Sequence, residues 1–165
     1  LPACLALCQR EGIPLTLAVL DLDHFKQLND EHGHLFGDQC LRQFATLLQQ
    51  HFQRPTDILV RFGGEEFVLI SVGVEETVMA QMLQQFVDDL ASQPVTLEQQ
   101  QSHYTVSIGW ICQIPQRDQN MAQWLAQVRI NARLLPLETR LTRDPTSGGW
   151  SGTVVLAGPG LTGGG

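Results

Sequence analysis

The chain has 165 residues, of which 43% are hydrophobic and 16% charged, a composition that predicts one soluble globular domain with a substantial core. Its net charge of −7 argues against a nucleic-acid backbone or an anionic membrane as a partner, although a small phosphorylated ligand stays compatible if a divalent cation accompanies it. No apolar run approaches the ~18 residues of a membrane-spanning helix, and four cysteines without zinc-ligand spacing favour a reducing compartment.

The first predicted strand ends in two acids. Residues 15–22 form a nearly continuous apolar run, which is typical of a strand covered on both faces, and a helix-like segment at residues 1–11 precedes it. Asp21 lies inside this run, and an acid at the end of a buried strand is a typical ligand position in a layered α/β fold. For Asp23, just beyond the strand, a cap on the helix that starts near His24 is the favoured interpretation.

A second, longer helix follows after a break at residues 33–38. Apolar residues recur at three- and four-residue steps from Cys40 to Phe52, which predicts an amphipathic helix of about four turns. Asp38 lies at the expected start of this helix, where an N-cap acid is common. The loop Arg54-Pro55-Thr56-Asp57 then leads to the next strand.

The run Arg61-Phe62-Gly63-Gly64-Glu65-Glu66-Phe67 is flanked by apolar, β-rich residues on both sides. Two such strands joined by Gly63 and Gly64 predict a tight hairpin, because glycine accepts the positive φ that these turns require. The hairpin would place Glu65 and Glu66 side by side at its rim, where two carboxylates repel each other unless a cation binds there. An ordinary hairpin with a solvated acidic tip is the alternative, and this stretch alone does not decide between them.

The rest of the chain predicts a helix, two paired strands and a final helix before the composition changes. The predicted elements are a helix around residues 78–90, strands at 95–97 and 104–111 that pair through a polar turn, and a helix at 121–135. Residues 145–165 are rich in Gly, Ser, Thr and Pro, which predicts a flexible tail with one β-like island at 153–156 that would add an edge strand. We therefore expect a folded domain over residues 1–144, of mixed α/β (α+β) class, with a central, mostly antiparallel, ferredoxin-like sheet flanked by helices.

Polar residues at the strand ends combine into a predicted nucleotide site. Asp21 and Glu65 are acids at the ends of neighbouring apolar strands, which suits the ligation of a hard cation by oxygen atoms. Lys26, one turn into the following helix, is within reach of a phosphate, and Asn29 and Asp38 are suited to reading a base edge. A carboxylate accepts two N–H groups at once, and guanine offers such a pair at N1 and N2 whereas adenine does not.

These segments resemble the GGDEF-domain diguanylate cyclases, in the variant with Gly-Gly-Glu-Glu-Phe. The resemblance covers roughly residues 13–125 and is carried in register by Asp21-Leu22-Asp23-His24-Phe25-Lys26, Asn29-Asp30, Gly33-His34, Gly37-Asp38, the hairpin run from Arg61 to Phe67, and Ser107-Ile108-Gly109. It implies a nucleotidyl-cyclase-like fold and the condensation of two GTP into cyclic di-GMP plus two pyrophosphates by a homodimer. It also implies a bacterial cytoplasmic location and an upstream sensory or regulatory domain.

The resemblance further implies roles for single residues in metal-assisted phosphoryl transfer. Asp21 and Glu65, with the carbonyl of Leu22, would hold Mg²⁺ or Mn²⁺. Glu66 would help to activate the ribose 3′-hydroxyl or complete the metal site. The implied contacts with GTP are guanine recognition by Asn29 and Asp38, phosphate contact by Lys26 and the backbone after Asp23, and room for the nucleotide at Gly63 and Gly64. Phe25 is also implied to bind GTP.

Arg54 and Asp57 form an Arg-x-x-Asp pattern, and five residues separate Asp57 from Gly63. In the family this spacing marks the inhibitory site for the product, cyclic di-GMP. Arginine can bind phosphate or the guanine edge through two N–H groups, and aspartate can accept from guanine. A salt bridge within the loop is the alternative interpretation.

The last predicted helix departs from the family pattern. Family members usually have an alanine-aspartate pair there, then a tyrosine, a lysine and a Gly-Arg-Asn ending. Here Arg129 lies near the aspartate position and Pro136 near the lysine position. Arg133, Arg140 and Arg143 are the candidates for the missing positive charge. The departure makes a catalytically weak receptor for cyclic di-GMP or GTP the second hypothesis, and a dimerisation module that binds no nucleotide the third.

Overall fold

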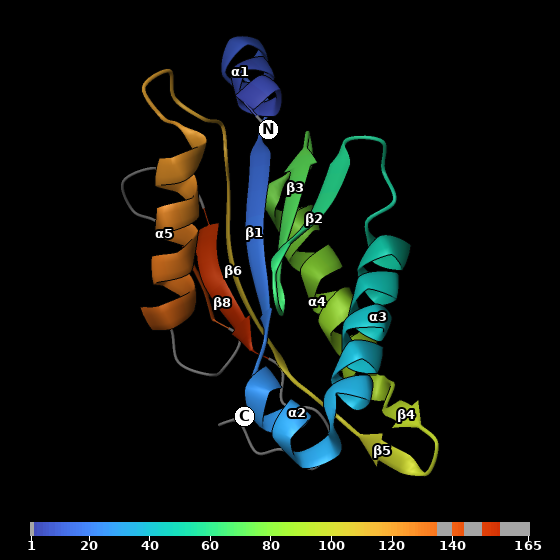
Figure 1. Ribbon diagram of the computed structural model, residues 1–165. Helices are drawn as coiled ribbons and strands as arrows, with labels where there is room; N and C mark the ends of the chain where they lie inside the picture. The colour runs from blue at the N-terminus through green and yellow to red at the C-terminus, as the bar shows by residue number, and fades with distance from the viewer. Residues whose placement is uncertain (1, 135–139, 144–149, 156–165) are drawn as a thin grey trace.

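The structure is a computed structural model that describes residues 2–134, 140–143 and 150–155 (Figure 1). No helix in these segments is long and apolar enough to cross a membrane. Along the chain, the helices and strands are α1 (Pro2–Glu11), β1 (Leu15–Leu22), α2 (Phe25–His32), α3 (His34–His51), β2 (Asp57–Gly63), β3 (Glu66–Val72), α4 (Glu76–Ser92), β4 (Val95–Leu97), β5 (Gln100–Ser102), β6 (Val106–Gln113), α5 (Met121–Leu134), β7 (Arg140–Arg143) and β8 (Trp150–Val155).

Six of the described strands form one sheet in the order β2-β3-β1-β6-β8-β7, and every neighbouring pair is antiparallel. β1 lies inside this sheet, between β3 and β6, and its residues from Leu15 to Leu20 are all buried. The apolar run of β1 therefore has the coverage on both faces that its sequence predicts. The predicted fold class, an antiparallel sheet flanked by helices in a mixed α/β chain, is confirmed.

The helices cover the sheet on both faces (Figure 1). α3 and α4 pack on one face, over a cluster that includes the fully buried side chains of Leu20, Phe44 and Trp110. α1 and α5 pack on the other face, where Cys8 and Val128 join the alternate residues of β1 in a second cluster. Burying one large apolar side chain stabilises a fold by about 1.5–3 kcal/mol. The two clusters together therefore fix the register of β1, and with it the position of its acidic end.

The pairing of β4 differs from the prediction. β4 pairs with β5 in a separate two-stranded sheet, through a turn in which Glu98 has a φ of +55°, whereas β6 pairs with β1 and β8. The prediction that residues 95–97 pair with 104–111 is wrong because Gln100–Ser102, which is polar and largely exposed, forms a strand instead of a turn. β6 joins the main sheet because its apolar residues are buried on both faces.

α3 begins earlier than predicted. The break is confined to Gly33, whose φ of +89° suits glycine, and the helix then runs for 18 residues from His34. The N-cap residue is Gly33, so the prediction of an N-cap at Asp38 is wrong. Asp38 lies in the second turn of α3 with its side chain exposed.

Part of the segment predicted as a tail belongs to the main sheet. Residues Trp150–Val155 form β8, which pairs with β6 between Ser107 and Cys112. This strand lies between β6 and β7, so it is not at the edge of the sheet. The other residues of the 145–165 segment are outside the described residues, and the domain boundary at residue 144 stays a prediction.

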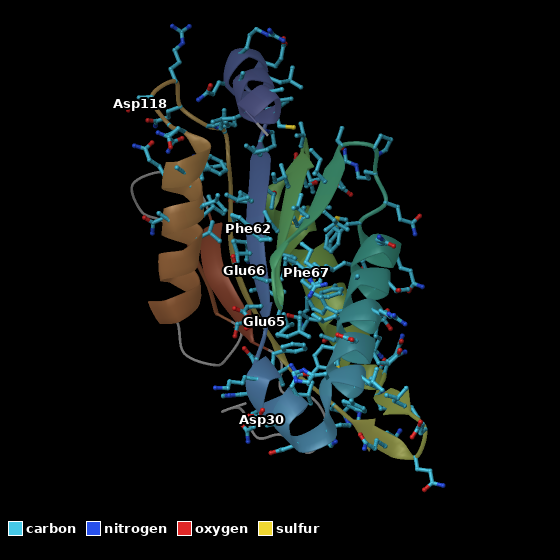
Figure 2. The ribbon with its side chains drawn as sticks, in the orientation of Figure 1. Asp30, Phe62, Glu65, Glu66, Phe67 and Asp118 are labelled. Atoms are coloured by element: carbon cyan, nitrogen blue, oxygen red, sulfur yellow. The ribbon has the colours of Figure 1, made fainter. Side chains whose placement is uncertain are left out.

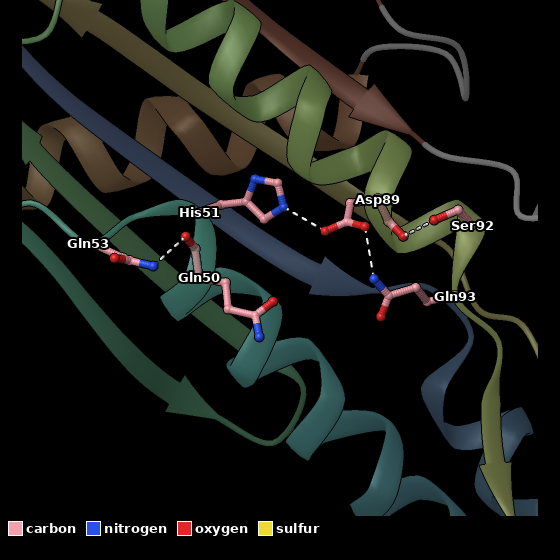
Figure 3. A network of polar contacts seen from close by, with 6 residues as sticks. All are labelled: Gln50, His51, Gln53, Asp89, Ser92 and Gln93. Atoms are coloured by element: carbon pink, nitrogen blue, oxygen red, sulfur yellow. Dashed lines mark hydrogen bonds and ion pairs between the residues drawn. The ribbon is translucent and has the colours of Figure 1, made fainter.

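A side-chain pair joins the C-terminal ends of α3 and α4 (Figure 3). Nε2 of His51 lies 2.8 Å from Oδ2 of Asp89, and the His51 ring meets Phe86 edge-on with 5.7 Å between ring centroids. Gln93 donates a hydrogen bond to the other carboxylate oxygen of Asp89 at 2.8 Å. This network fixes the two helices to each other about 20 Å along α3 from Asp38.

Candidate active site

The predicted acidic hairpin is present, with its turn one residue later in the chain. Gly63 pairs with Glu66, so the two turn residues are Gly64 and Glu65 and the prediction of a Gly63-Gly64 loop is corrected. Gly64 has a φ of +49° at the first turn position, which glycine accepts without strain. A β-bulge between Arg61 and Gly63 produces the shift. Arg61 closes the turn, because its Nε donates to the carbonyl of Gly64 at 2.8 Å.

Strand pairing brings the acids of the hairpin to the end of β1. Asp21 is paired with Glu66 of β3 on one side and with Ser107 of β6 on the other. The backbone N–H of Leu22 donates to the carbonyl of Glu65 at 3.3 Å, so the turn is held beside the strand end (Figure 2). A cleft of about 400 Å³, which we term the acidic cleft, opens there. Its walls include Asp21, Leu22, Phe25, Lys26, Glu65 and Glu66.

Asp21 is the acid most affected by this arrangement. Burial is the largest cause, followed by repulsion from Glu65, Glu66 and Asp23, and together they raise the pKa of Asp21 from 3.8 to about 6. Near neutral pH the Asp21 carboxylate is therefore ionised against the combined effect of burial and three like charges. A divalent cation in the acidic cleft would offset both effects, because it supplies the opposite charge at short range.

Asp23 does not cap α2. The N-cap residue is His24, which has a φ of +53° and makes no side-chain capping hydrogen bond. The Thr105 hydroxyl donates to Oδ2 of Asp23 at 2.6 Å, and the Ser107 hydroxyl donates to Oδ1. The predicted cap is wrong because the helix starts one residue further on, which leaves the Asp23 side chain against the start of β6.

The first turn of α2 supplies the positive end of the acidic cleft. Phe25 and Lys26 are the first two residues of the helix, and both line the cleft. Lys26 is the only lysine in the sequence. Its side chain is exposed and forms no ion pair with any residue that the structure describes. An ammonium group and the N–H groups of a helix N-terminus both favour an anion at this position.

Asn29 and Asp38 lie on neighbouring helices in different surroundings. Oδ1 of Asn29 is buried and has no hydrogen-bond partner among the described residues. A Cβ at Gly37 would clash with this atom, so only glycine allows the observed contact between α2 and α3. Asp38 lines a separate cleft of about 420 Å³ between α3 and β2, which we term the α3–β2 cleft. Phe67 lines it too, so the hairpin strands border both clefts.

Arg54 and Asp57 close their loop without an ion pair. The backbone N–H of Arg54 donates to Oδ2 of Asp57 at 3.1 Å, and the hydroxyl of Ser71 donates to Oδ1 at 2.6 Å. In the described part of the chain the Arg54 guanidinium has no ion pair, so the interpretation as a loop salt bridge is wrong. Asp57 is level with Thr16 of β1, about 17 Å along the sheet from Asp21.

The basic residues near the C-terminal end of the described chain belong to α5 and β7. α5 ends at Leu134, close to its predicted end. The side chains of Arg129, Arg133, Arg140 and Arg143 are outside the described residues, as is Pro136.

The donors of the acidic cleft suit a hard cation that keeps part of its water shell. Nowhere in the described segments do three His, Cys, Asp or Glu side chains gather as a metal site. The predicted set contains only two carboxylates, Asp21 and Glu65, with the Leu22 carbonyl as third donor. Mg²⁺ is commonly bound in this way, through one or two carboxylates, waters and the phosphates of its substrate. The set of oxygen donors and the raised pKa of Asp21 therefore fit Mg²⁺ or Mn²⁺.

A family comparison identifies the family of the fold. The family model described as "Diguanylate cyclase, GGDEF domain" matches residues 2–135. This chain belongs to the GGDEF-domain diguanylate cyclase family. It is thus a member of a family of cyclases that synthesise cyclic di-GMP.

Relatives of this GGDEF domain are longer proteins. Diguanylate cyclase DgcP of Pseudomonas aeruginosa is 39% identical over 100 residues, which are 61% of this chain and 15% of that protein. Diguanylate cyclase VdcA of Vibrio cholerae is 52% identical over 60 residues, which are 36% of this chain and 17% of that protein. The GGDEF domain of DgcB from Caulobacter crescentus, crystallised in complex with c-di-GMP, is 27% identical, with a TM-score of 0.74 over 81% of this chain and 78% of that one. The chain therefore spans less than a fifth of the length of these two curated relatives.

The predicted site residues of this GGDEF domain do not all lie in one cleft. The predicted metal and phosphate residues share the acidic cleft, Asp38 lines the α3–β2 cleft, and Arg54 and Asp57 lie towards the other end of the sheet. Gly63 and Gly64 are exposed, and a Cβ on either would meet no atom of the described residues within 4 Å. Sequence reasoning missed Thr105 altogether. For Ser107, the family signature Ser-Ile-Gly was a signal, although it did not reveal the bond to Asp23.

Proposed function

We propose that this GGDEF domain condenses two molecules of GTP into cyclic di-GMP and releases two pyrophosphates. Each domain holds one GTP, and two copies face each other so that the 3′-hydroxyl of each GTP meets the α-phosphate of the other. The observation that carries the proposal is the acidic cleft, where Asp21, Glu65 and Glu66 lie beside the first turn of α2 and the only lysine of the chain. This combination of negative and positive groups supports the binding of a cation together with a triphosphate.

The residues of the acidic cleft have separate roles in phosphoryl transfer. Asp21 and Glu65, with the carbonyl of Leu22, would hold Mg²⁺ or Mn²⁺. When bound, the cation supplies charge neutralisation at the α-phosphate and the pyrophosphate. Lys26 and the N–H groups at the start of α2 bind the phosphates. Glu66, opposite Asp21 in the strand pairing, takes the proton of the 3′-hydroxyl or completes the metal site.

Guanine recognition belongs to the helices α2 and α3. Oδ1 of Asn29 is a buried acceptor without a partner in the described structure, and such atoms are rare unless a ligand or water satisfies them. The exposed carboxylate of Asp38 accepts the two N–H groups of guanine. Because the hairpin strands border both clefts, a nucleotide lying across the hairpin places its base near Asp38 and its phosphates near Lys26. The open space at Gly63 and Gly64 accommodates it.

Product inhibition is assigned to Arg54 and Asp57. The carboxylate of Asp57 is oriented by Ser71, and the exposed Arg54 guanidinium has no ion pair in the described part of the chain to compete with a phosphate or a guanine edge. A ligand there does not occupy the acidic cleft, so inhibition acts from a distance. The same observation favours the second candidate function, a receptor for cyclic di-GMP, in which this site works while the divergent last helix weakens catalysis.

Synthesis is tested by incubating the protein with GTP and Mg²⁺ over a range of protein concentrations and measuring cyclic di-GMP. We expect a rate that rises more steeply than linearly with concentration, because two copies must meet. Glu65→Ala should abolish the metal-dependent product and leave the fold nearly intact, since Glu65 lies in a surface turn. Asp30→Asn removes an exposed acid of α2 and is the matched control. No product from the wild type at any concentration contradicts the cyclase assignment.

The receptor function is tested by calorimetric titration with cyclic di-GMP. We expect binding to the wild type and a loss of about tenfold or more in affinity for Arg54→Ala, because a charge-assisted contact is removed. An unchanged affinity in the variant would remove Arg54 from the site. If neither GTP with Mg²⁺ nor cyclic di-GMP raises the Tm of the wild type, the third hypothesis, a dimerisation module without nucleotide, becomes the better account.

A further inference from the structure

The connection between β1 and α2 is short and contains a residue in a left-handed conformation. Only Asp23 and His24 separate the strand from the helix, and His24 has a φ of +53°, a left-handed conformation that residues with a side chain rarely adopt. Strained backbone of this kind persists only where the surrounding structure holds it, and it is concentrated at functional sites. The turn leads directly from Leu22 to Phe25, and both residues line the acidic cleft.

Asp23 fastens this turn by three hydrogen bonds to Thr105, the residue just before β6, and to Ser107 of β6. Its backbone N–H donates to the carbonyl of Thr105 at 2.9 Å. The Thr105 hydroxyl donates to Oδ2 at 2.6 Å, and the Ser107 hydroxyl donates to Oδ1. Thr105 is buried, so the bond at Oδ2 is shielded from competing water. We term Asp23, Thr105 and Ser107 the turn clamp.

We propose that Asp23 is a positioning residue, which through the turn clamp aims the Leu22 carbonyl and the first N–H groups of α2 into the acidic cleft. The inference deepens the proposed function and rests on it for the identity of the ligand. The neighbouring contact on the other side, from the N–H of Leu22 to the carbonyl of Glu65, ties the same turn to the hairpin. The strand end is thus held from both sides, and the strained residue follows immediately.

The chemistry of the clamp separates this role from direct ligation of a cation. Both carboxylate oxygens of Asp23 already accept hydrogen bonds from hydroxyls. An asparagine can replace both bonds, because its oxygen accepts from one hydroxyl and its NH₂ group donates to the other. An alanine can replace neither. A positioning role therefore predicts that Asp23→Asn resembles the wild type and Asp23→Ala does not, whereas a cation ligand would require the charge and would fail in both variants.

The test measures the affinity for GTP in the presence of Mg²⁺ on the wild type, Asp23→Asn, Asp23→Ala and the double variant Thr105→Val with Ser107→Ala. We expect Asp23→Ala and the double variant to weaken binding by about tenfold or more and Asp23→Asn by less than about threefold. Tyr104→Phe is the matched control, because it removes a buried hydroxyl beside the clamp that bonds to Gln43 on α3. It should lower the Tm and leave the affinity unchanged.

Hydrogen exchange of the backbone amides of residues 23–28 provides a readout that needs no ligand. Exchange in Asp23→Ala should become faster in this segment relative to the rest of the sheet, and Asp23→Asn should preserve the wild-type rates. If the wild type does not bind GTP, the proposed function fails, and the exchange rates alone still decide the clamp. Unchanged exchange in Asp23→Ala, or an affinity loss in Asp23→Asn as large as in Asp23→Ala, overturns the positioning role.

Discussion

Replacing Asp21 by asparagine should stabilise the protein near neutral pH in the absence of divalent cations. The folded protein raises the pKa of Asp21 from 3.8 to about 6, mainly by burial and then by repulsion from Glu65, Glu66 and Asp23. Between these two pH values the unfolded chain releases the Asp21 proton while the folded chain retains it. The free energy of unfolding therefore falls as the pH rises from about 4 to 6, and the penalty is complete above 6.

The size of the effect follows from the same values. A rise in pKa from 3.8 to about 6 corresponds to at most about 3 kcal/mol. Asp21 is only partly buried, so solvent screening reduces this to about 1–2 kcal/mol. For a chain of this length each kcal/mol changes the Tm by about 2–4 °C. Asp21→Asn should therefore melt about 2–8 °C higher than the wild type at pH 7.5 and at nearly the same temperature at pH 3.5.

The assay is thermal unfolding in EDTA at several pH values, with the exposed Asp30→Asn as the control whose pH dependence should match the wild type. Adding Mg²⁺ with GTP should raise the Tm of the wild type and not that of Asp21→Asn, because the ligand of the cation is missing. A Tm of Asp21→Asn at or below the wild-type value at pH 7.5 would refute the reasoning, since it would mean that the ionised side chain stabilises the cleft without a cation.

Two further predictions concern other parts of the molecule. Gly37→Ala places a Cβ against Oδ1 of Asn29, and this side chain must move. The variant should therefore lose about 1–3 kcal/mol of unfolding free energy, measured by urea unfolding. It should also bind guanine nucleotides more weakly, measured by calorimetry. Nucleotide affinity unchanged by Gly37→Ala would count against Asn29 as a base contact. His51→Ala removes the bond to Asp89 shown in Figure 3 and should lower the Tm by about 2–4 °C, with GTP affinity unchanged because the pair lies about 20 Å along α3 from Asp38. An altered affinity there would show that the two helix ends are coupled to the site.

The sequence predicted those parts of the fold that depend on local pattern. The apolar run of β1 and the helical spacing in α3 and α4 report burial directly, because each residue's environment is set by its position in the period. The metal and phosphate residues were identified as a group because their spacing matches a family, and the structure places six of them around one cleft. The position of the turn at Gly64 was missed by one residue, since a β-bulge changes the pairing without a clear signal in the sequence.

Two further errors concern hydrogen bonds that the sequence pattern does not reveal. The partners of Asp23 lie 82 and 84 residues further along the chain, so no local pattern distinguishes its carboxylate from an ordinary helix cap. The β4–β5 hairpin was missed for a related reason: its second strand is polar, and only its pairing with Val95–Leu97 makes it a strand. The Asp23 carboxylate and the strand β5 are both defined by hydrogen bonds, and the residues around them do not indicate the partners of these bonds.

The acidic cleft lies at the end of an interior strand, and this position explains how the fold tolerates charge repulsion and backbone strain there. Repulsion at Asp21 and backbone strain at His24 both oppose folding at the same strand end. β1 is stable enough to tolerate this repulsion and strain, because it is paired along its length with β3 and β6 and buried by helices on both faces. β2, with four exposed residues at its hairpin end, is an edge strand among the strands that the structure describes, and none of these lies on its outer side to hold such a turn in place. The interior strand therefore positions the charges, and the edge hairpin brings the remaining acids to them.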